Sequence, residues 1–158
     1  MEKNLLKVHF KLNQNEDGYP PFSSEAIWCE KLDEHRFRVD NIPFFVTGVS
    51  FSDIVSVHEE PEGYLNFDEL VEEGGHSTIR VMFLDNPDDR RPFEVRAREL
   101  AGQLDALGCG ISVSPPPLLL AIDIPPAGAI GTVQTLLTKG EDKGLWSYEE
   151  GTLAHSTD

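Results

Sequence analysis

The residues of this chain that could do chemistry are its histidines, serines and cysteines, and their spacing argues against catalysis. The turn Gly75-His76-Ser77-Thr78 places a possible base directly beside a possible nucleophile. Neighbouring side chains on a strand point to opposite faces, so His76 and Ser77 cannot pair with each other as base and nucleophile. We therefore interpret this turn as a structural linker and predict that the protein is not an enzyme.

Patterns that bind metals or phosphates are also missing. The five histidines occupy positions 9, 35, 58, 76 and 155, and none lies four residues from another histidine or a cysteine. The absence of CxxC, GxxxxGK[ST] and GxGxxG patterns argues against a zinc site and against nucleotide hydrolysis. Paired catalytic carboxylates stay open, because chance pairs are certain among 28 acidic residues. We predict no cofactor and no metal.

Charge is the strongest property of the sequence, whose formal net charge is −15 over 158 residues. Nucleic acids and anionic membranes require basic footprints, so this charge argues against both as partners. A basic protein is the natural complement of such a surface. The competing interpretation is that the acidic surface only keeps the protein soluble.

The negative charge is densest in the segment 53–73, which contains no lysine or arginine. Aromatic side chains surrounded by acids suit a surface that engages a basic protein. The candidate partner-binding residues are Asp53, Glu59, Glu60, Glu62, Tyr64, Phe67, Asp68, Glu69, Glu72 and Glu73. The alternative is an acidic face of a β-structure whose aromatic residues belong to the core.

A basic cluster occurs in the second half of the chain. It consists of Arg90, Arg91, Arg96 and Arg98, with acidic residues interspersed. We interpret it as a solvated face of mixed charge, and the alternative is a site for an anion or an acidic partner.

The elements that must position these residues differ between the two halves of the chain. In residues 1–75, short alternating segments separated by turns cover 7–12, 25–32, 36–40, 44–49, 54–59 and 64–71. Alternation with a period of two predicts half-buried strands. Several short strands with turns between them predict a small β-barrel of the SH3-like kind.

Residues 76–158 combine strands with helices. Strands are predicted over 78–84, 110–114, 118–124 and 145–150. Apolar residues three and four apart predict one helix from Pro92 to Gly108 and another from Pro125 to Gly140. This order matches a ferredoxin-like βαββαβ unit, in which helices cover one face of an antiparallel sheet.

The fold class is therefore α+β, with a barrel subdomain over 1–75 packed on a ferredoxin-like subdomain over 76–158. Each half is near the size at which a single core becomes marginal, so the two are expected to unfold together. Residues 155–158 are expected to form a loose tail.

The expected cellular compartment follows from two sequence features that the chain lacks. It has no apolar stretch long enough for a membrane span, and its first residues do not resemble a signal peptide. We expect a cytoplasmic protein in which Cys29 and Cys109 are both reduced.

Several short motifs of the chain resemble one protein family. They are Trp28-Cys29-Glu30, the segment 36–45, Gly48-Val49-Ser50, Asp53-Ile54-Val55, the segment 75–81, Leu119, Ala121, Asp123, Pro125, Trp146 and Tyr148-Glu149-Glu150-Gly151. This pattern is similar to the uncharacterised bacterial family catalogued as domain of unknown function 4265. The resemblance implies a bacterial origin and a shared fold, and it brings no activity or catalytic residues.

Small size, high negative charge and missing catalytic motifs together suggest a protein-binding inhibitor. The specific hypothesis is an immunity protein that neutralises a cognate bacterial toxin, because nuclease-type toxins carry basic clefts that an acidic protein can cover. The alternative is a small-molecule-binding or regulatory module of the ferredoxin-like type. An enzyme of unrecognised type is the third hypothesis, and it would require a deep pocket with convergent polar groups.

Overall fold

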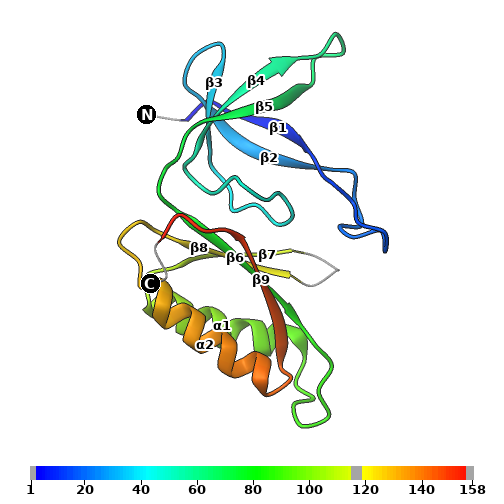
Figure 1. The fold of residues 1–158 in the computed structure, drawn as a ribbon, viewed down its shortest axis with the longest axis vertical. Helices are drawn as coiled ribbons and strands as arrows, with labels where there is room; N and C mark the ends of the chain where they lie inside the picture. Colours follow the sequence, from blue (N-terminus) through cyan, green and yellow to red (C-terminus); the bar gives the residue numbers. More distant parts are fainter. Residues whose placement is uncertain (1–2, 115–118, 156–158) are drawn as a thin grey trace.

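The computed structural model describes residues 3–114 and 119–155. Within these residues the chain is a mixed α+β protein, with mostly antiparallel strands in two sheets and with two helices. Figure 1 shows the first sheet above and the second sheet below it, with the helices on the side of the second sheet that faces away from the first. No helix of the described residues is long and apolar enough to cross a membrane.

The first sheet closes into a barrel. Its strands, in order around the barrel, are β1 (Leu5–Lys11), β2 (Ser24–Lys31), β3 (Arg36–Val39), β4 (Ile54–Glu59) and β5 (Leu65–Glu72). Parallel pairing of β1 with β5 completes the closure, and the other neighbours are antiparallel. Alternate residues such as Val8, Phe10, Val55 and Val57 point inward and form the barrel core, as the period of two in the sequence predicts.

The second sheet has the strand order β7-β8-β6-β9 and is antiparallel throughout. Its elements are β6 (Ser77–Phe83), α1 (Phe93–Ala106), β7 (Gly110–Val113), β8 (Leu119–Ile124), α2 (Ile130–Asp142) and β9 (Trp146–Thr152). Every residue of β8 is buried, as expected of a central strand with such an apolar sequence. Leu118 and the prolines 115–117 lie outside the described residues.

The predicted bounds of the second helix are wrong at both ends. Residues 125–128 form a turn in which the Gly128 amide donates to the Pro125 carbonyl at 2.8 Å, and α2 begins only at Ile130. Gly140 lies inside the helix, and the indole ring of Trp146 packs where a β-carbon at this position would stand. The chain reverses instead at Gly144, whose φ of +74° is accessible to glycine at little cost.

The strand predicted over 44–49 is also wrong, because this segment is part of an irregular connection between β3 and β4. Its backbone groups bind side chains rather than a neighbouring strand. The carboxylate of Glu25 accepts the amides of Phe44, Phe45 and Val46 at 2.7 to 3.0 Å. Hydrophobic alternation cannot distinguish such a segment from a strand, since the partner is a single carboxylate 19 to 21 residues away.

The connection 40–53 joins the two units, because it packs against the face of the second sheet that the helices leave open (Figure 1). The hydroxyls of Ser50 and Thr78 lie 2.6 Å apart and are fully buried. The Gly48 amide donates to Oγ1 of Thr152 at 2.9 Å. The barrel is therefore attached to the second sheet through one of its own loops.

This interface predicts that the barrel and the second unit unfold in one transition. Cys29 lies in the barrel core and Cys109 in the second core, and both thiols are free and buried. Burial raises the pKa of Cys29 to about 12, which suppresses its reaction with alkylating reagents in the native state. Pulsed alkylation across a denaturant series, read by mass spectrometry of peptides, should give the same midpoint for both thiols. Two separate midpoints would show that the units unfold independently.

Candidate functional site

Most of the predicted partner-binding residues lie on the outside of β4, β5 and the turn between them. We call this surface the acidic face. It consists of Glu59, Glu60, Glu62, Tyr64, Asp68, Glu69, Glu72 and Glu73. Tyr64 has an exposed fraction of 58% and packs edge-on against His9 at a centroid distance of 5.5 Å.

Irregular pairing of β5 explains why so many acids reach solvent. Ser56 of β4 pairs with Glu69 and the next residue, Val57, pairs with Phe67, so Asp68 is an extra residue in β5. This β-bulge lets Asp68 and Glu69 both face water, although strand neighbours normally point to opposite sides. The sequence signals the acids but does not signal the bulge.

Two of the predicted contact residues are not on this surface. Asp53 is only 3% exposed, and its carboxylate accepts the amides of Ser50 and Gly74, each at 2.8 Å. Burial raises the pKa of Asp53. Phe67 is partly buried and stacks on Phe10 of the barrel core at 4.8 Å. Asp53 and Phe67 therefore lie outside the acidic face, and both make contacts that stabilise the fold.

One histidine moderates the charge of the acidic face. The imidazole of His58 bonds to Glu60 through Nε2 at 2.8 Å and to Asp68 through Nδ1. The bond to Glu60, followed by the bond to Asp68, raises the pKa of His58. The protonated ring stabilises the fold below its unfolded pKa near 6.5, and this contribution is lost as the pH rises through the raised folded value. The acidic face therefore becomes more negative as pH rises.

The turn that sequence analysis weighed as a catalytic candidate contains a serine–histidine contact of a different kind. Oγ of Ser77 lies 2.6 Å from Nδ1 of His155 and accepts the amide of Ala154 at 2.9 Å. Nε2 of His155 donates to the Pro125 carbonyl at 2.6 Å, so Nδ1 is free to accept the Ser77 hydroxyl. Ser77 is fully buried, which leaves no room for a substrate. The contact fastens the C-terminal segment, and the prediction of a loose tail is wrong for His155; residues 156–158 lie outside the described residues.

The neighbouring His76 points to the other side of the strand, as predicted. Its Nδ1 lies 2.8 Å from Oδ1 of Asp123, and its ring packs against Phe51 at 5.4 Å. Burial raises the pKa of Asp123 despite the contact with His76. His76 thus links the β3–β4 connection to β8, and these contacts are structural.

The basic cluster of the second unit is mixed with acids, as the sequence indicates. Arg91 pairs with Asp89 at 2.8 Å and also contacts Glu99. Arg96 is buried and donates to the carbonyls of Leu84 and Leu145 at 3.0 and 2.7 Å. Arg96 therefore fixes the loop before α1, and Arg91 is neutralised on the surface.

The junction of the two units contains a polar site that sequence reasoning missed. Arg80 projects from β6 toward the β3–β4 connection, and its side chain is only 1% exposed. Nε donates to Glu149 at 2.8 Å, and Nη1 donates to the carbonyls of Val46 and Pro43 at 2.8 and 3.4 Å. Nη2 has no hydrogen-bond partner among the described residues. The available signal in the sequence was a charged residue within the apolar run 79–83 of β6, between Ile79 and Val81.

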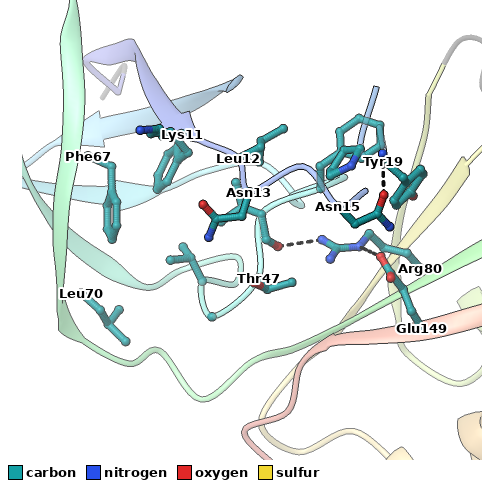
Figure 2. A pocket seen from close by; sticks show the side chains of 16 residues that line it. Lys11, Leu12, Asn13, Asn15, Tyr19, Thr47, Phe67, Leu70, Arg80 and Glu149 are labelled. Atoms are coloured by element: carbon teal, nitrogen blue, oxygen red, sulfur yellow. Dashed lines mark hydrogen bonds and ion pairs between the residues drawn. The ribbon is translucent and has the colours of Figure 1, made fainter. Parts of the chain in front are cut away.

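A cavity of about 390 Å³ opens beside this arginine (Figure 2). Its walls come from β1 and the loop after it, from the β3–β4 connection, from β5 and from the second sheet. The apolar part includes Phe10, Phe45, Val49, Phe67 and Leu70, and the polar part includes Lys11, Asn13, Tyr19, Thr47, Arg80 and Glu149. Burial, followed by the charge of Glu149, raises the pKa of Tyr19. Such a junction is a common place for a ligand site.

Across residues 3–114 and 119–155, the histidines, cysteines and acids form no group of three that could hold an ion.

Comparisons with known proteins agree with this architecture. A family model described as Domain of unknown function (DUF4265) matches residues 25–148. A structure titled "Novel crystal structure of a hypothetical protein from Neisseria gonorrhoeae" is similar over 99% of both chains, with a TM-score of 0.74 and 22% sequence identity. At this identity the likeness shows the fold alone. No curated protein matches the chain.

Proposed function

This chain belongs to the family that carries the domain of unknown function DUF4265, and from its surface charge we propose that it is an acidic protein-binding inhibitor. Its target in this proposal is a basic, nuclease-type bacterial toxin, which makes the chain an immunity protein acting in the cytoplasm without enzymatic activity. The observation that carries the proposal is the acidic face on β4 and β5, with Tyr64 exposed among carboxylates.

We also propose a specific fold type for each of the two units. We assign the barrel to the SH3-like kind and the second unit to the ferredoxin-like kind. The strand order β7-β8-β6-β9 and the sequence order of strands and helices favour the second assignment, and closure of five short strands favours the first.

The proposed inhibition has an electrostatic step and an anchoring step. Carboxylates on the acidic face attract a basic cleft over a distance of about one Debye length, roughly 8 Å at physiological ionic strength. Tyr64 then loses its hydration against the partner, and a desolvated tyrosine at an interface contributes about 2 kcal/mol or more. Charge therefore governs association, and Tyr64 governs dissociation.

The test uses, as the candidate partner, the C-terminal domain of the protein encoded immediately upstream of this chain's gene. Reversing the charges of Glu59, Glu62, Glu69 and Glu72 to lysine avoids Glu60 and Asp68, which hold His58. The association rate measured on a sensor surface should fall at least tenfold at low salt, as expected when steering is lost, and by less at high salt. Tyr64→Ala should instead speed dissociation.

A matched control separates the acidic face from net charge. Reversing Glu16, Asp17, Asp105 and Asp142, which are exposed elsewhere, changes the net charge by the same amount. This variant should keep most of the association rate. Equal losses in both variants, or an upstream domain that does not bind, would remove the proposal.

A second candidate function is the binding of a small molecule, and one observation favours it. The cavity beside Arg80 combines an apolar wall with a buried guanidinium that has an unused donor.

A further inference from the structure

We propose that the cavity between the barrel and the second sheet binds a small carboxylic acid with an apolar body. Its carboxylate would pair with Arg80, and its apolar part would lie against the aromatic wall of the cavity. This inference rests on the second candidate function and names its ligand class, and it is independent of the first because the residues that line the cavity are separate from those of the acidic face.

The donors of Arg80 define the charged end of this ligand. A guanidinium presents Nε and Nη2 side by side, in the spacing that matches the two oxygens of one carboxylate. In the structure Nε meets a single oxygen of Glu149, and Nη2 meets no acceptor among the described residues. A buried donor without an acceptor is unfavourable, so this edge of Arg80 is primed for a second oxygen.

The solvent exposure of Glu149 allows a ligand carboxylate to replace it as the partner of Arg80. Its side chain is 50% exposed, whereas Arg80 is enclosed. The Glu149 carboxylate can therefore rotate into water and regain hydration while an incoming carboxylate takes its place and keeps Arg80 paired. Gly151 leaves the room for Nη2, since a β-carbon there would lie 2.7 Å from this atom.

The rest of the cavity defines the body of the ligand. Phe10, Phe67 and Leu70 form an apolar wall on the barrel side, as Figure 2 shows for Phe67 and Leu70. Lys11 stands at the rim, where its charge favours entry of an anion into a protein that is otherwise acidic. A volume of about 390 Å³ is sufficient for an aryl or short alkyl acid.

Phenylacetate is a suitable probe, and phenylacetamide is its uncharged match. We expect phenylacetate to shift the backbone amide resonances of Thr47, Gly48 and Gly151 in a two-dimensional NMR titration of the whole protein. Phenylacetamide should produce at most a small shift at the same concentrations. Equal responses to the acid and the amide would overturn the proposal.

Variants of the two glutamates on β9 test whether Glu149 competes with the ligand for Arg80. Glu149→Gln keeps an acceptor for Nε but removes the competing charge, so phenylacetate should bind about tenfold more tightly, equivalent to 1.4 kcal/mol. Glu150→Gln, which changes the adjacent exposed glutamate, should leave the affinity unchanged. Unchanged or weaker binding by Glu149→Gln would contradict the exchange. Because this variant keeps the buried arginine and its hydrogen bonds, the result does not depend on whether Arg80 variants fold.

Discussion

Replacing Gly140 with alanine is expected to lower the free energy of unfolding by about 2 kcal/mol, although alanine is the better helix former. A β-carbon at this position would overlap Cζ2 and Cε2 of the Trp146 indole ring. The ring cannot move aside easily, because its Nε1 donates to the Leu137 carbonyl at 2.9 Å and it packs against Phe83. The measurement is denaturant unfolding followed by circular dichroism.

Gly102 supplies the matched control for this prediction. It lies inside α1, is exposed, and has nothing within 4 Å of an added β-carbon. Gly102→Ala should therefore stabilise the protein by about 0.5–1 kcal/mol through the lower entropy of the unfolded chain. If Gly140→Ala stabilised the protein as Gly102→Ala is expected to do, the packing of Trp146 against α2 would be looser than this contact requires.

Replacing Glu149 with alanine is expected to destabilise the protein by about 3 kcal/mol, because it leaves the charge of Arg80 buried without a counter-charge. Arg80 is enclosed, and the carbonyls of Val46 and Pro43 satisfy only Nη1. The effect should appear in denaturant unfolding as a lower midpoint with an unchanged slope.

The double variant Arg80→Met with Glu149→Ala tests whether Glu149→Ala is unstable because it leaves the charge of Arg80 unpaired or because it loses packing. Methionine retains much of the apolar volume and removes the charge, so the double variant should be more stable than Glu149→Ala alone. Additive losses would mean that the hydrogen bonds of Arg80 to the β3–β4 connection outweigh the cost of its buried charge. The comparison therefore measures how the two units are held together.

The family assignment and the α+β class were both predictable from the sequence. Short-range patterns predict the class, because a period of two along β1 or β4 and a spacing of three and four along α1 are set by backbone geometry. The family was predictable for another reason, the resemblance of short motifs along the chain. The family model confirms the resemblance over residues 25–148. The role as an immunity protein and the partner remain predictions.

The errors occurred where a distant side chain determined the local structure. Three amides on Glu25 make 44–46 irregular, and Gly140 leaves room for the ring of Trp146 inside α2 and does not end the helix. Each case depends on a contact that no local pattern contains.

The sequence by itself determined the kinds of elements, their order and the excess of negative charge, since these depend on local periodicity and composition. Only the tertiary structure decided which of the acids reach solvent. It buried Asp53 against two backbone amides and left Glu59 and Glu69 in water. It also placed Arg80 of β6 beside Val46 of a loop 34 residues earlier, and so created the cavity at the junction. The reason is physical: burial and hydrogen-bond partners are properties of the assembled chain, and they decide the behaviour of a charged group more than its identity does.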